Sequence, residues 1–165
     1  MKKLLLISAS SGENFKLTEK VVEILGSHFH YEIIDLTQSS LPLYTSDEEE
    51  NGIPEQACIL ANKIKKADAL FITSPEYNGS VAPTLNNMIA WVSRSSKDWR
   101  ESFNGKVTVI GTHSGGGGSH ALMAMRQQFS FIGCNVLGRV IHTNYSKPLN
   151  TESVEKIFSQ VKKYI

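Results

Sequence analysis

Ser74-Pro75-Glu76-Tyr77-Asn78-Gly79-Ser80-Val81-Ala82-Pro83 links two segments of different periodicity. The segment before it, 69–73, is a short apolar run rich in β-branched and aromatic residues, which predicts a buried strand. In the segment after it, apolar residues recur at helical spacing, at Leu85, Met88, Ile89 and Val92. Pro83 suits the first turn of that helix, where its missing N–H costs nothing. The quoted residues are therefore predicted to form a loop that leads from a strand into a helix.

A loop of this kind lies at the carboxyl edge of a parallel sheet, where open α/β folds bind their ligands. Gly79 would let a ligand approach the backbone closely. The alternative is a connector in which proline and glycine only shape a turn. Two further loops of unusual composition favour a binding site, so the candidate residues here are Pro75, Glu76, Tyr77, Asn78 and Gly79.

The rest of the chain repeats the same alternation of strand and helix. Strands are predicted at 4–7, 31–36, 69–73, 106–111 and 136–141, and a segment with helical periodicity follows each of them. Strict alternation requires right-handed crossovers and a parallel sheet covered by helices on both faces. The strand order is left open by the pattern, but the order 2-1-3-4-5 would bring the loops after strands one, three and four to one edge. We expect a single domain over residues 1–165.

Composition limits the class of partner. The formal net charge is +1 and 20% of the residues are charged, so no basic field favours nucleic acid or an anionic membrane. No apolar run approaches the length of a transmembrane helix, which predicts a soluble, cytoplasmic protein that acts on a small molecule. Cys58 and Cys134 form no CxxC pair and lie in apolar contexts, so we expect two buried, hydrophobic cysteines and no metal site.

The loop after the first strand is rich in hydroxyl groups and opens a helix. Ser10, Ser11, Gly12 and Asn14 offer hydroxyls, amides and a positive helix end, which together suit a phosphate. The alternative is ordinary helix capping, with Asn14 as the N-cap. Because the loop lacks G-x-G-x-x-G, a monophosphate is favoured over a pyrophosphate.

The loop after the fourth strand is nearly all glycine. Its candidate residues are His113, Ser114, Gly115 and Gly116. Without side chains, a flat ligand can lie against the backbone and accept hydrogen bonds from its N–H groups. A flexible lid is the alternative. His113 is equally consistent with contact to a ligand and with a hydrogen bond to its own loop.

Three further stretches accompany these loops: Asp35-Leu36 with Leu41-Pro42-Leu43-Tyr44, Ala67-Asp68-Ala69, and Ser74-Pro75-Glu76-Tyr77-Asn78-Gly79-Ser80-Val81. Together they resemble the NADPH-dependent FMN reductase family of flavodoxin-like proteins, and the resemblance spans nearly the whole chain. It implies a flavodoxin-like three-layer sandwich with a five-stranded parallel sheet of order 2-1-3-4-5. It also implies bound FMN, with its phosphate on the first loop and its ring between the second and third, and NADPH or NADH as hydride donor.

Two stretches depart from the family pattern. The first loop lacks the usual Arg and places Glu13 beside the expected phosphate, which works against tight FMN binding. The family's Leu-Lys-Asn-x-x-Asp-Trp appears as Leu85-Asn86-Asn87-Met88-Ile89-Ala90-Trp91, without the Lys and the Asp. The resemblance implies a homodimer or homotetramer built around this helix, and Trp91 is expected either at that interface or in the core of the domain.

The activity that these features predict is hydride transfer from the nicotinamide to FMN and on to a quinone, an azo compound, a metal oxyanion or free flavin. The cofactor carries the chemistry, so we expect no catalytic acid or base among the side chains. The alternative is a non-enzymatic FMN electron carrier like flavodoxin, although such carriers are typically strongly acidic. An α/β-hydrolase is excluded, because no acidic residue lies between Ser119 of the elbow-like 117–121 segment and His142, the last histidine.

Overall fold

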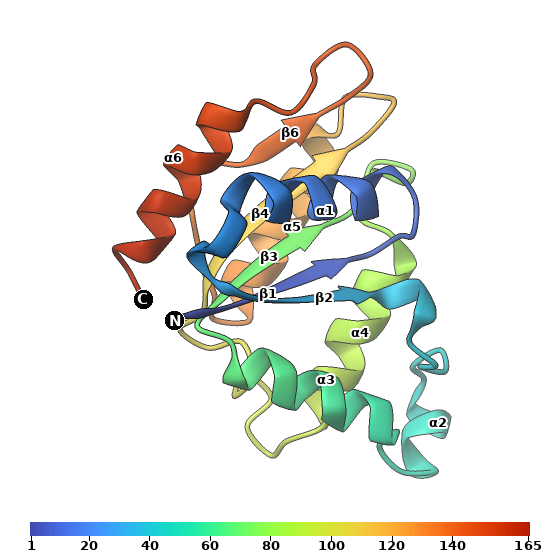
Figure 1. Cartoon of the computed structure of the whole chain (residues 1–165). Coiled ribbons are helices and arrows are strands. Elements are labelled where there is room, and N and C mark those ends of the chain that lie inside the picture. The colour runs from blue at the N-terminus through green and yellow to red at the C-terminus, as the bar shows by residue number, and fades with distance from the viewer.

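The computed structural model describes residues 1–165 and shows one parallel sheet between two layers of helices (Figure 1). Neighbouring strands follow the path β2-β1-β3-β4-β5, which confirms the predicted 2-1-3-4-5 order. The strand bounds are β1 Lys3–Ser8, β2 His30–Asp35, β3 Ala69–Thr73, β4 Val107–His113 and β5 Asn135–Val136. The winding direction reverses between β1 and β3, and the carboxyl ends of these strands form the point at which such sheets bind ligands.

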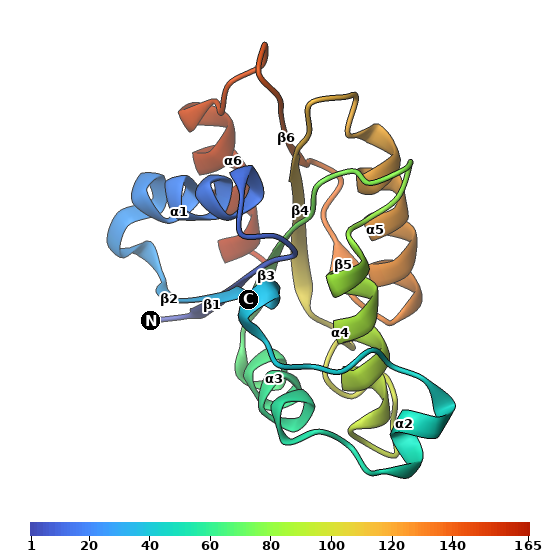
Figure 2. The ribbon, with the colours of Figure 1, turned by 90° about the vertical axis from the view of Figure 1, so that its right-hand side faces the viewer.

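Helices of the two layers pack on opposite faces of the sheet (Figure 2). One face carries α1 (Glu13–Leu25) and α6 (Thr151–Lys162). The other carries α3 (Glu55–Lys66), α4 (Pro83–Arg94) and α5 (Ser119–Phe131). The chain also forms a short helix α2 (Ser46–Glu50) and 3-10 turns at Gly26–His28 and Leu36–Gln38. Alternate residues of β3 enter the two cores, which explains its continuous apolar sequence.

The fifth strand differs from the prediction of one strand over 136–141. The structure forms two short strands, β5 and β6 (Ile141–Thr143), and both pair in parallel with β4. Between them the chain leaves the ladder, and the Arg126 guanidinium of α5 donates to the carbonyls of Leu137 at 2.9 Å and Gly138 at 3.2 Å. After this interruption, β6 pairs with the end of β4, where Thr143 lies beside His113.

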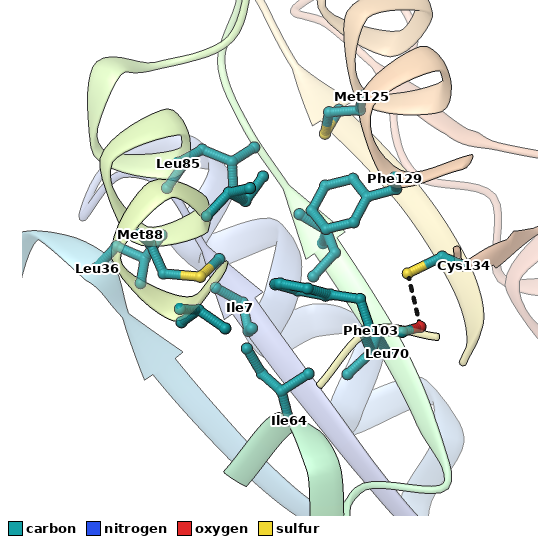
Figure 3. Packing of buried hydrophobic residues seen from close by; sticks show 14 of the residues in the cluster. Ile7, Leu36, Ile64, Leu70, Leu85, Met88, Phe103, Met125, Phe129 and Cys134 are labelled. Carbon is teal, nitrogen blue, oxygen red and sulfur yellow. Dashed lines mark hydrogen bonds between the residues drawn. The ribbon is translucent and has the colours of Figure 1, made fainter. Parts of the chain in front are cut away.

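The larger core lies under α3, α4 and α5 (Figure 3). Phe103 and Phe129 meet there edge to face, with ring centroids 6.0 Å apart, and the buried Cys134 thiol donates to the Phe103 carbonyl. Cys58 is exposed, so the prediction of two buried cysteines is correct only for Cys134. α3 buries Ala57, Leu60, Ala61 and Ile64, and position 58 faces away from that stripe.

Trp91 is fully buried within the domain, which decides between its two expected positions. Its indole N–H donates to the Pro42 carbonyl at 2.8 Å, and its ring meets Tyr44 edge to face at 5.1 Å. The indole therefore anchors the segment before α2 to α4 and is not available to a partner chain.

No helix has the length and hydropathy that crossing a bilayer requires.

Candidate functional site

A cleft of about 410 Å³ opens where the loops after β1, β3 and β4 meet. Its size falls in the range of small-molecule sites. Most of the predicted site residues line it: Ser10, Ser11, Gly12, Asn14, Pro75, Glu76, Tyr77, His113, Ser114 and Gly115. The predicted convergence of the three loops is therefore present in the structure.

Asn78, Gly79 and Gly116 are predicted site residues that do not line this cleft. Asn78 and Gly79 have φ of 51° and 73°, and Tyr77 and Ser80 on either side exchange backbone hydrogen bonds of 2.9 and 3.0 Å. Positive φ at both central residues is the geometry of the tight hairpin turn that Asn-Gly favours. These two residues thus shape the turn that presents Tyr77, as in the connector alternative, and their contact with a cofactor stays a prediction.

Helix α1 begins without a side-chain cap. Gly12 occupies the N-cap position, so the prediction of Asn14 as the N-cap is wrong. The N–H groups of Gly12, Glu13 and Asn14 donate to no protein acceptor, and all three residues line the cleft. Free N–H groups at the positive end of a helix form an anion-binding site.

The buried side chain of Asn14 instead links α1 to the end of β4 by hydrogen bonds. Its side chain is 2% exposed, its Oδ1 accepts from the His113 N–H at 2.8 Å, and its Nδ2 donates to the His113 carbonyl at 2.8 Å. This pairing imitates the hydrogen bonds of a neighbouring strand. It holds the glycine loop against the first loop, because His113 is the last residue of β4.

The residues behind the His113 ring favour one tautomer. The Thr143 hydroxyl donates to the Thr112 carbonyl at 3.1 Å, so Thr143 Oγ1 accepts from His113 Nδ1, 3.1 Å away. His113 Nε2 then carries a lone pair, and it is buried without a partner. Although His113 lines the cleft, Nε2 itself is shielded from solvent, so a ligand hydroxyl or N–H group would reach this atom only if the ring or its neighbours moved. Nδ1 thus bonds within the protein and Nε2 does not, and contact of His113 with a ligand stays a prediction.

Glu76 ties the second loop to α5. Its Oε2 accepts from the N–H groups of His120 at 2.9 Å and Ala121 at 3.3 Å, in the first turn of the helix. Burial by itself would raise the pKa of Glu76, but the Ala121 and His120 N–H donors outweigh burial and hold the pKa below its usual value. The carboxylate therefore caps α5 across the fold, although Glu76 also lines the cleft.

Charge in the cleft is negative. The charged residues that line it are Glu13 and Glu76, and its lining contains no Lys or Arg. Glu13 pairs with Lys16 at 2.7 Å, and this hydrogen-bonded ammonium lowers the pKa of the Glu13 carboxyl. Glu13, the acidic residue that follows the first loop, thus lines the cleft, and its paired cation lies outside the cleft.

Several lining residues were missed by sequence reasoning, notably Thr37, Thr84 and Tyr145. Thr84, in the first turn of α4, donates its hydroxyl to the Ala9 carbonyl at 2.6 Å and so ties α4 to the first loop. Tyr145 follows β6, and its ring meets His113 edge to face at 5.1 Å. Its position depends on the broken fifth strand, for which the sequence pattern carries no signal. No cluster of three or more His, Cys, Asp or Glu side chains is arranged to hold a metal ion.

Comparisons with known proteins show the family of the chain. The model of the family described as NADPH-dependent FMN reductase matches residues 2–146. An NAD(P)H-dependent FMN reductase of Pseudomonas aeruginosa is 32% identical over 132 residues, covering 79% of this chain and 69% of that protein. A quinone reductase of Escherichia coli is 36% identical over 104 residues, or 61% of this chain, and the match spans only 54% of that protein.

Among solved structures, FerB of Paracoccus denitrificans, described as a flavoenzyme NAD(P)H:(acceptor) oxidoreductase, superposes with a TM-score of 0.81. The superposition covers 99% of both chains at 20% identity, so this likeness shows the fold alone. The assignment to a family rests on the family model and on the Pseudomonas aeruginosa relative. The chain belongs to the family of NADPH-dependent FMN reductases, flavin oxidoreductases that use FMN as cofactor and NAD(P)H as hydride donor.

Proposed function

We propose that the cleft holds FMN with its phosphate at the first turn of α1 and its ring between the loops after β3 and β4. The observation that carries this proposal is the row of free N–H groups at Gly12, Glu13 and Asn14 beside the hydroxyls of Ser10 and Ser11. A phosphate would satisfy donors that the protein leaves unpaired.

The remaining polar groups of the cleft also fit a flavin. A small movement of the His113 ring would let its unpartnered Nε2 accept from a hydroxyl of the ribityl chain. The N–H group of Gly115, which lines the cleft, donates to no protein acceptor and is available to the carbonyl edge of the ring. Tyr77 is 51% exposed and lines the cleft, so its ring can cover one side of a flat ligand.

When bound, FMN supplies hydride transfer between NAD(P)H and an electron acceptor. The protein binds and orients the cofactor, and we propose no catalytic acid or base. The acceptor is a small molecule, and a quinone or an azo compound is the substrate class that we favour. An E. coli relative is named quinone reductase, and a Bacillus anthracis azoreductase has the same fold with a TM-score of 0.69.

The proposal is tested by comparing FMN with riboflavin, which lacks the phosphate. We expect FMN to bind much more tightly, as measured by flavin fluorescence, and anaerobic NADPH or NADH to bleach the bound flavin. Equal affinities for the two flavins would refute the phosphate assignment. FMN binding without bleaching by either nicotinamide would replace the reductase with the electron carrier.

Glu13→Gln gives a sharper test of the same phosphate site. The substitution removes a carboxylate from the anion site and frees Lys16 from its ion pair. FMN affinity should rise several-fold while riboflavin affinity stays unchanged. The matched control is Glu19→Gln, an exposed position on the same helix that does not line the cleft.

Assembly and location complete the proposal. We propose a homodimer or homotetramer whose contact uses exposed apolar side chains of α5, Met123 and Phe131, together with Trp99. Light scattering should show a mass above 18.3 kDa that Phe131→Ser reduces. A cytoplasmic location is consistent with two free cysteines, Cys58 and Cys134.

A further inference from the structure

A second hollow of about 230 Å³ adjoins the cleft. It lies between α1 and the segment that follows β6, and it shares Glu13, His113 and Tyr145 with the cleft. The two hollows are therefore neighbouring compartments, with the His113 and Tyr145 rings on the wall between them.

The hollow supplies the positive charge that the cleft lacks. Lys16 and Lys20 line it from α1, one helical turn apart. Lys16 is already paired with Glu13, whereas Lys20 takes part in no ion pair. A free ammonium thus stands beside a cleft whose own charged residues are carboxylates.

The remaining walls of the hollow suit a flat base. Leu17, Pro148 and Leu149 form its apolar side, and Tyr145 is 80% exposed at its edge. An aromatic ring and an apolar floor next to a cation are the groups that recognise an adenosine phosphate.

We propose that this hollow binds the adenosine end of the nicotinamide donor, with Lys20 pairing with its 2′-phosphate and Tyr145 stacking on its adenine. NADPH, which carries this phosphate, is then favoured over NADH, which does not. The inference rests on the proposed function, because the nicotinamide must lie in the cleft while the adenosine occupies the neighbouring hollow.

Lys20 is a better candidate for this phosphate than Lys16. Releasing Lys16 would leave Glu13 unpaired beside a second negative group, which is unfavourable. Lys20 also lies about 6 Å further from the start of α1, so it is the more distant of the two lysines from the proposed FMN phosphate. The cleft thus serves the flavin and the nicotinamide, and the hollow serves the adenosine end of the donor.

The test uses protein loaded with FMN and two ligands that carry no nicotinamide, adenosine 2′,5′-bisphosphate and AMP. We expect calorimetry to show tighter binding of the bisphosphate by the parent. Lys20→Gln should weaken bisphosphate binding about tenfold, as for loss of a charge-assisted hydrogen bond, and leave AMP binding unchanged. The kcat/KM for NADPH should fall by a similar factor, and that for NADH should not.

Lys66→Gln is the matched control, since Lys66 is an exposed, unpaired lysine at the end of α3 on the other face of the sheet. It should bind both ligands like the parent. Equal binding of bisphosphate and AMP by the parent, or unchanged bisphosphate binding by Lys20→Gln, would overturn the proposal. Weaker FMN but unchanged riboflavin binding in Lys20→Gln would assign Lys20 to the flavin phosphate and overturn it too. The titration needs no hydride transfer, so its outcome is separate from a failure to bleach the flavin.

Discussion

Replacing Asn14 by Ala removes the tie between α1 and the end of β4. Both hydrogen bonds to the His113 backbone are 2.8 Å long, and the asparagine is 2% exposed. Leaving a buried backbone donor or acceptor unpaired costs about 1–3 kcal/mol. Because His113 is only half-buried and water reaches part of it, we expect the free energy of unfolding to fall by about 2–4 kcal/mol for the two groups together. FMN affinity should fall as well, since two loops of the proposed FMN site separate.

Urea unfolding of the apo-protein, followed by circular dichroism, measures this loss through the midpoint at constant m. Asn14→Asp should be no better than Ala, because a carboxylate accepts from the His113 N–H but repels its carbonyl. Asn62→Ala, on the exposed side of α3, is the control and should change stability by less than about 0.5 kcal/mol. If Asn14→Ala unfolds within about 0.5 kcal/mol of the parent and binds FMN equally well, the reasoning is refuted.

Other consequences follow from the same contacts. Glu76→Gln should lower stability by about 1 kcal/mol at pH 7. Because the folded pKa of Glu76 is lowered, this advantage of the parent is fully present above the unfolded pKa of about 4.3 and is lost as pH falls through the lower folded pKa. Urea unfolding at pH 7 and pH 3 would show no such difference if Glu76 did not cap α5. Burial raises the pKa of Cys134 to about 11, so a thiol reagent at pH 8 should label only Cys58 in the folded protein. The free energy of unfolding should fall as pH rises from about 8.5 toward 11, because the unfolded thiol ionises first. Two fast-reacting thiols would contradict this. Gly118→Ala should destabilise by about 1–3 kcal/mol, because φ is 71° and the added Cβ would lie 2.9 Å from a threonine methyl. Gly115→Ala adds a Cβ at an ordinary contact distance of 3.4 Å from the Tyr145 ring, so it should fold normally, but it places a methyl group in the cleft and should weaken FMN binding. A normal melt for Gly118→Ala, or parent-like FMN affinity for Gly115→Ala, would count against these assignments.

Much of the fold could be predicted because its signals are local. Five apolar runs alternate with helical periodicity, and Pro83 marks the start of α4 where the structure begins it. The exposure of Cys58 could also have been predicted, since helical spacing buries positions 57, 60, 61 and 64 on one face of α3 and leaves position 58 outside it. The break in the fifth strand could not be predicted, because the carbonyls that it leaves free accept hydrogen bonds from Arg126, which belongs to a different element.

The site was predictable as a set of loops but not as a set of contacts. Strand order brings the loops after β1, β3 and β4 together, whatever their side chains do. The partners of Asn14 and Glu76, however, lie 99 and 44 residues away in the chain, and no local pattern encodes them. Tyr145 lines the cleft only because β6 continues to the end of β4. Long-range pairing therefore accounts for most of what sequence reasoning missed.

Each of the three loops is held by a side chain from another part of the fold, and this bears on how tightly a ligand can bind. Asn14 holds the end of β4, Glu76 holds the start of α5, and Thr84 holds the first loop through Ala9. Ordering a loop at the moment of binding costs free energy that a pre-ordered loop does not. The cleft is negatively charged and has no cation of its own, so charge attraction alone cannot explain binding of a phosphate there. We infer that these ties compensate, because they keep the free N–H groups of α1 and the glycine loop in place before the ligand arrives.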